Sequence, residues 1–147
     1  MIEEVIKQEE KYIFNNFTNK DAYTLGNLII KKVEDNKLKN VRIRIVIDND
    51  IVFQYIMDGK KGEEWLDRKQ NTVEKYQHSS YYVYLQQDTI KDLDVNDSSL
   101  AICGGGFPLV INNTIRGCII VSGLAHDEDH QLIIDCLKEF KDESICE

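Results

Sequence analysis

The chain has 147 residues, of which 42% are hydrophobic and 30% charged, a length and composition that predict one domain with a buried core. Eighteen basic and 26 acidic residues leave a formal net charge of −8, which disfavours nucleic acids and anionic membrane surfaces as partners. Because no apolar run approaches the roughly 18 residues of a membrane span and the N-terminus is acidic, we expect neither a membrane span nor a secretory signal and place the protein in the cytoplasm.

Two amphipathic helices are predicted at the start of the chain. Apolar residues recur at near-helical spacing over residues 2–15, which indicates the first helix. The same spacing over residues 17–37 indicates the second, with Thr18 or Asn19 as its N-cap. Gly26 interrupts this second helix, where glycine costs about 1 kcal/mol relative to alanine, so we expect another backbone to pack closely against it.

A β-hairpin follows the two helices. Residues 41–48, VRIRIVID, alternate apolar and basic side chains and predict a strand with one buried face. Residues 51–57, IVFQYIM, form the second strand after a short polar turn. The basic positions of the first strand, Arg42 and Arg44, form a local basic spot that suits a small anion.

A third helix is predicted over residues 63–80, EEWLDRKQNTVEKYQHSS, and a short fourth helix from Ser79 or Ser80. The apolar stripe of the third helix consists of Trp65, Thr72, Val73 and Tyr76, and Lys69 falls on the same stripe. Such a lysine exposes only its ammonium, pairs with a carboxylate across an interface, or binds an anionic ligand in a pocket, and the sequence leaves these alternatives open. The adjacent Arg68 is a forked donor suited to carboxylates.

The last third of the chain predicts three strands and a helix. The strands span about 99–103, 107–111 and 114–121, and the last two form a hairpin. The final helix begins near Ala125 to Asp127, with His130 on the side of its apolar stripe. The elements together predict an α+β protein, a single domain over residues 1–147, built on a five-stranded antiparallel sheet flanked by helices in a profilin-like layout.

Three segments together resemble a known family. WLDRKQNTVEKYQHSS at 65–80, CGGGFPL at 103–109 and VSGLAHDEDH at 121–130 are similar to uncharacterised protein family 0303, within the haem-degrading-domain-like superfamily. That superfamily includes the C-terminal domain of a corrinoid adenosyltransferase and a small protein of glycolate operons. The resemblance implies an antiparallel sheet with flanking helices, a dimer-based homo-oligomer, and haem or tetrapyrrole binding in some relatives.

Two groups of residues in these segments allow both a functional and a structural interpretation. Gly104, Gly105 and Gly106 form either a tight strand corner or a concavity of N–H groups that holds an anion, but no nucleotide loop, since no Gly-Lys-Ser/Thr follows. The acids of residues 127–129 suit the first turn of a helix, and His130 is a general base, a metal or haem ligand, or a packed polar residue. His126 lies four residues before His130, but no third metal ligand is evident, so we predict no metal site.

The cysteines show neither metal-ligand nor redox spacing. We expect them to be reduced, with Cys103 and Cys118 buried in strands of the core.

From these observations we predict a cytoplasmic, homo-oligomeric small-molecule-binding protein, with a small anion or a tetrapyrrole such as haem as its ligand. The predicted ligand-binding residues are Arg68, Lys69, Gly104, Gly105, Gly106, Ser122, Gly123, Asp129 and His130. Two alternatives remain open. One is an enzyme with His130 as general base and Arg68 or Lys69 holding substrate charge, and the other is a protein-interaction scaffold that uses the aromatic run at 79–86.

Overall fold

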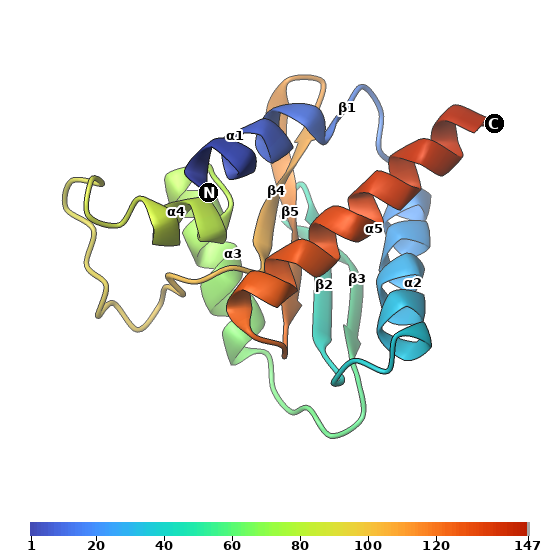
Figure 1. The fold of residues 1–147 in the computed structure, drawn as a ribbon, viewed down its shortest axis with the longest axis horizontal. Helices are drawn as coiled ribbons and strands as arrows, with labels where there is room; N and C mark the ends of the chain where they lie inside the picture. Colours follow the sequence, from blue (N-terminus) through green and yellow to red (C-terminus); the bar gives the residue numbers. More distant parts are fainter. Residues whose placement is uncertain (147) are drawn as a thin grey trace.

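A computed structural model describes residues 1–146, with side chains through residue 143. Figure 1 shows a sheet with helices packed on it. The helices are α1 (Ile2–Lys11), α2 (Asn19–Asp35), α3 (Glu64–Tyr76), α4 (Ser80–Leu85) and α5 (His126–Cys146). The strands are β1 (Ile13–Phe14), β2 (Arg42–Ile47), β3 (Asp50–Ile56), β4 (Gly106–Ile111) and β5 (Thr114–Ser122). Within residues 1–146, no helix is both long and apolar enough to cross a membrane.

The sheet has five strands, as predicted, in the order β1-β4-β5-β2-β3. It is mixed, with both parallel and antiparallel strand pairs. The predicted all-antiparallel sheet is wrong at one edge, where β1 runs parallel to β4 and pairs Ile13 with Val110. The first helix was also expected to reach residue 15. It ends at Lys11 because the next residues enter the fold: Tyr12 is buried and Ile13–Phe14 join the sheet.

The strand predicted at 99–103 is absent, because α3 takes up the polar groups of this segment. The Asn71 side chain donates to the carbonyl of Ser99, and Arg68 donates to that of Leu100. The Thr72 hydroxyl both donates to the carbonyl of Ala101 and accepts from its N–H, at 3.0 and 2.9 Å. Side chains of one helix thus hold this segment in place of a neighbouring strand.

Helices cover both faces of the sheet. The larger core lies under α2 and α5, which lie side by side over one face in Figure 1. The smaller core lies on the opposite face under α3 and contains Val46, Leu66, Val73, Cys118 and Ile120. The β2 strand was expected to have one buried face, but it is buried on both sides because α3 covers the side that carries the basic residue Arg44.

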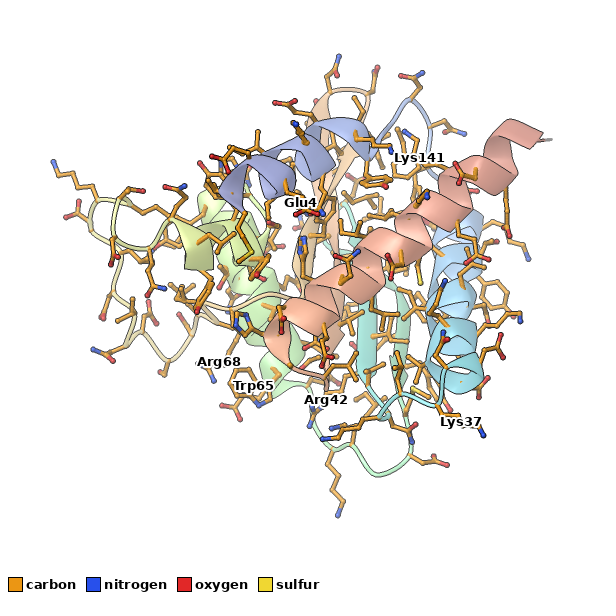
Figure 2. The ribbon with its side chains drawn as sticks, in the orientation of Figure 1. Glu4, Lys37, Arg42, Trp65, Arg68 and Lys141 are labelled. Atoms are coloured by element: carbon orange, nitrogen blue, oxygen red, sulfur yellow. The ribbon has the colours of Figure 1, made fainter. Side chains whose placement is uncertain are left out.

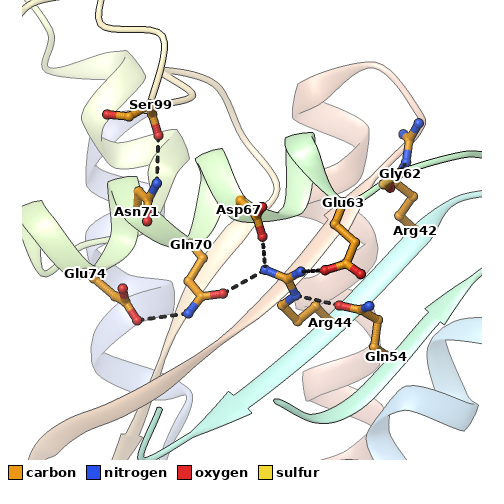
Figure 3. A network of polar contacts seen from close by, with 10 residues as sticks. All are labelled: Arg42, Arg44, Gln54, Gly62, Glu63, Asp67, Gln70, Asn71, Glu74 and Ser99. Atoms are coloured by element: carbon orange, nitrogen blue, oxygen red, sulfur yellow. Dashed lines mark hydrogen bonds and ion pairs between the residues drawn. The ribbon is translucent and has the colours of Figure 1, made fainter. Parts of the chain in front are cut away.

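Arg44 is buried beneath α3, with an exposed fraction of 2%. Its guanidinium donates to Gln54, Glu63, Asp67 and Gln70 at 2.6–2.9 Å, as Figure 3 shows. Both carboxylates remain about half exposed. Arg44 therefore does not form a free anion site with Arg42; it fixes the start of α3 to the sheet.

Two helix details follow from local chemistry. Thr18 is the N-cap of α2, as predicted, and forms a capping box with Asp21. Gly26 does allow a close approach, but to the ring of Phe53 rather than to another backbone, since an added Cβ would lie 2.4 Å from that ring.

In α3 the buried positions are Leu66, Lys69, Thr72 and Val73. Trp65 is 41% exposed, so its predicted place on the apolar stripe is wrong.

Candidate functional site

Four of the nine predicted ligand-binding residues line one pocket of about 320 Å³: Lys69, Ser122, Gly123 and Asp129. The pocket lies where the first turns of α3, the 101–105 segment, the end of β5 and the start of α5 converge. Its lining residues are Arg42, Lys60, Trp65, Lys69, Cys103, Ser122, Gly123, Leu124, His126 and Asp129. Arg42 and Trp65 are labelled near this end of α3 in Figure 2. A larger hollow of about 480 Å³ lies between α2 and α5, but it contains none of the predicted site residues.

A buried ion pair forms the floor of this pocket. The Lys69 ammonium lies 3.1 Å from Oδ2 of Asp129 and donates to the carbonyl of Val121 at 2.9 Å. Both residues of the pair are 2% exposed. Burial raises the pKa of Asp129, while Lys69 and the backbone N–H groups of Leu124 and Gly123 act in the opposite direction. Lys69 therefore pairs with a carboxylate of its own chain, and not with one across an interface as one of the alternatives had it.

The three glycines make this close packing possible. Gly105 has a φ of +121°, and a Cβ on it would lie 2.5 Å from the Lys69 nitrogen and 2.4 Å from the Val121 carbonyl oxygen. The N–H of Gly104 donates to Nδ1 of His126, and that of Gly106 donates to the hydroxyl of Ser80. Because these two N–H groups are used inside the fold, the geometry favours the strand corner over an anion concavity.

His130 is near this ion pair in sequence but does not line the same pocket. Its Nε2 lies 2.7 Å from Oε1 of Gln8 on α1, and its ring packs against Tyr81 and Phe107. Burial lowers the pKa of His130 to about 4, so the ring is neutral at physiological pH. It lines a separate pocket of about 280 Å³ between α1, α4 and α5.

Arg68 also lies outside the lining. It donates from Nε to the Leu100 carbonyl and stacks 4.3 Å from the Trp65 ring centroid. Arg68, Lys69 and His130 therefore do not meet at one pocket, which removes the geometric basis for the enzyme alternative that combined them.

Six of the lining residues were not among the predicted site residues: Arg42, Lys60, Trp65, Cys103, Leu124 and His126. Arg42 holds the loop before α3 by donating to the carbonyls of Lys61 and Gly62, and that loop carries Lys60 to the pocket. The sequence signal for Arg42 was its alternation with the apolar residues of β2. Lys60 had no comparable signal, because its position depends on the path of the loop. His126 was considered only as a metal partner of His130.

In the described part of the chain, no group of three or more His, Cys, Asp or Glu side chains is arranged to hold a metal ion. Cys103, Cys118 and Cys136 are free thiols. Cys118 is buried in β5, as predicted, but Cys103 lies half-buried in the 101–105 segment rather than in a strand. Burial raises the pKa of the Cys103 thiol.

Comparisons with known proteins point to one family. A family model described as "Haem degrading protein HbpS-like" matches residues 17–138. A UPF0303 protein of Psychromonas ingrahamii is 32% identical over 146 residues, which cover 94% of this chain and 91% of that protein. A UPF0303 protein of Brucella canis is 34% identical over 148 residues, with coverages of 94% and 86%.

Solved structures share the fold. The crystal structure of the Ybr137w protein has a TM-score of 0.89 and 27% identity, and the match covers 99% of this chain and 90% of that one. HbpS has a TM-score of 0.67 at 18% identity, with coverages of 82% and 87%. A structure titled as a PduOC:Heme complex has a TM-score of 0.66 at 13% identity, with coverages of 83% and 93%. At these last two identities, the likeness shows the fold alone.

Proposed function

The chain belongs to the HbpS-like family of haem degrading proteins, and from this premise we propose that it binds a small organic anion in the pocket floored by Lys69 and Asp129. The observation that carries the proposal is the charge of the lining. Arg42, Lys60 and Lys69 contribute three cations, whereas Asp129 is the one acid among the described residues of the lining. This excess of positive charge lies in a protein whose formal net charge is −8.

The hydrogen bonds within the lining support an anion more specifically than the charge count does. Asp129 already accepts from Lys69, Leu124 and Gly123, so its oxygens have little capacity for a ligand donor. The Lys60 ammonium has no ion-pair or hydrogen-bond partner among the described residues, and the Arg42 guanidinium is bonded only through Nε and Nη2. A carboxylate at the mouth of the pocket would be bound by these free donors.

Two neighbouring lysines provide a matched test. Lys60 lines the pocket and Lys61 does not, although both lie in the same loop and carry the same charge. Calorimetric titration with succinate, glutarate and citrate is expected to give saturable binding to the natural protein. Lys60→Ala should weaken it by about threefold, as expected for loss of a partly exposed charge, while Lys61→Ala leaves it unchanged. No binding of any acid, or equal effects of both substitutions, would refute the proposal.

A tetrapyrrole is the second candidate ligand, because the family is described as haem degrading and a neighbour's title names a haem complex. The lining fits the carboxylates of such a ligand but does not fit its iron. His126 accepts the Gly104 N–H through Nδ1, so its neutral ring carries the proton on Nε2 and offers no lone pair to a metal. Lys69 is paired, and burial raises the pKa of the Cys103 thiol.

The expected absorption spectrum with hemin follows from the lack of an iron ligand in the lining. Titration with hemin should show no histidine-ligated iron that depends on His126. A Soret shift typical of imidazole ligation, lost in His126→Phe, would contradict this assignment of the pocket. Competition between hemin and succinate would show whether both ligands use the same cations.

We further propose that the protein self-associates and resides in the cytoplasm. The seven-residue strand β3 lies at an edge of the sheet, and its Ile51 and Tyr55 are 49% and 40% exposed. An exposed edge strand of this length is a ready surface for pairing with another strand. Light scattering should give a mass above 17.1 kDa that falls on Ile51→Lys substitution.

The free thiols support a reducing compartment, which imaging of the tagged full chain would test.

A further inference from the structure

Resting on the anion site proposed above, we propose that the pocket selects an oxo acid over the corresponding amino acid, and that His126 is the residue that makes this distinction. The chemistry required of the ligand follows from which polar groups of the lining are already used. The carboxylate and ring-nitrogen acceptors already hold hydrogen bonds, whereas several donors keep an unused N–H group.

The carboxylate and ring-nitrogen acceptors of the lining already hold hydrogen bonds. Asp129 accepts three through its two oxygens, and one of these comes from Lys69, which also donates to the carbonyl of Val121. Nδ1 of His126 accepts the Gly104 N–H at 2.9 Å. A ligand ammonium would therefore enter among cations and find these side-chain acceptors already bonded.

Several donors of the lining retain groups without a hydrogen-bond partner among the described residues. Lys69 uses two of its three N–H groups, on Val121 and Asp129. The bond from Gly104 fixes the neutral His126 tautomer with its proton on Nε2, which has no hydrogen-bond partner among the described residues. Ser122, 6% exposed at the end of β5, likewise has no side-chain partner there. A ligand carbonyl oxygen next to a carboxylate would accept hydrogen bonds from such donors. A ligand ammonium has only N–H donors of its own and could not accept these bonds.

Three five-carbon diacids test the preference for an oxo acid over an amino acid. 2-Oxoglutarate, glutarate and L-glutamate share a carbon skeleton and both carboxylates, and they differ at one substituent. We expect 2-oxoglutarate to bind more tightly than glutarate and about tenfold or more tightly than glutamate, as measured by calorimetry at one pH and ionic strength. If all three fail to bind, the anion site itself is refuted. If glutarate binds but glutamate matches 2-oxoglutarate, only the selectivity is refuted.

Two substitutions test the role of His126. Asparagine places an acceptor near the position of Nδ1 and keeps the bond from Gly104, but it removes the donor at the position of Nε2. Glutamine reaches the Nε2 position and can present an N–H there. His126→Gln should retain the preference for 2-oxoglutarate over glutarate, and His126→Asn should lose it while glutarate still binds. A preference that survives in His126→Asn would overturn the assignment of His126.

Discussion

Replacement of Lys69 by methionine tests the buried ion pair that organises the pocket. The substitution keeps most of the side-chain volume but leaves Asp129, 2% exposed, without its cation. Removal of one partner of a buried pair costs about 3–5 kcal/mol. Asp129 retains backbone N–H donors at 2.9 and 3.4 Å, so we expect the lower end, about 3 kcal/mol, and a fall in Tm on the order of 10 °C.

The pH dependence of this loss identifies its cause. Burial raises the pKa of Asp129, and without Lys69 it rises further. A folded-state pKa above the unfolded value of about 3.9 means that the folded state binds more protons, so stability falls as the pH rises through the folded pKa. The deficit of Lys69→Met should therefore be larger at neutral pH than at acidic pH close to that pKa.

The assay is urea unfolding of the natural protein and of Lys69→Met at both pH values, with Lys75→Met as a control. Lys75 is an exposed residue of the same helix, and its replacement should change the free energy of unfolding by less than about 0.5 kcal/mol. Lys69→Met combined with Asp129→Leu should recover part of the loss, because no unpaired charge remains buried. A Lys69→Met deficit below about 1 kcal/mol, or one that grows on acidification, would refute this account of the pair.

Further predictions concern His130, Gly105 and Arg44. The pKa of His130 is about 4 in the fold and about 6.5 when unfolded, so the protein loses stability as pH falls from 6.5 towards 4, by up to about 3 kcal/mol. His130→Gln should flatten that slope in acid-unfolding curves, and an unchanged slope would contradict the burial of His130. Gly105→Ala should destabilise more than Gly59→Ala by calorimetry: both have positive φ, but an added Cβ meets the Val121 oxygen at Gly105 and nothing within 4 Å at Gly59. Arg44→Met should cost about 2 kcal/mol in urea, less than Lys69→Met, since its carboxylate partners can be solvated.

The family and the α+β class were predictable from the sequence, and both are confirmed. Periodicity located the β2–β3 and β4–β5 hairpins because alternation along a strand is a local property. The mixed sheet was not predictable in this way. The two residues of β1 carry no alternation, and their pairing with β4 depends on tertiary position alone.

The site shows the same division between local and tertiary information. Lys69 stood out because a charge on an apolar helix stripe needs a partner, and Asp129 is that partner. Lys60 and His126 have no such local signal. Lys60 reaches the pocket through a loop held by Arg42, and His126 gains its fixed tautomer only from a backbone N–H 22 residues away in sequence.

Calorimetric titration of the natural protein with glutarate, beside Lys60→Ala and Lys61→Ala, tests the central claim most directly. The predicted result is saturable binding that weakens in Lys60→Ala and is unchanged in Lys61→Ala. Absence of heat from binding at millimolar acid, or binding that neither substitution affects, would contradict the claim that this pocket holds an organic anion.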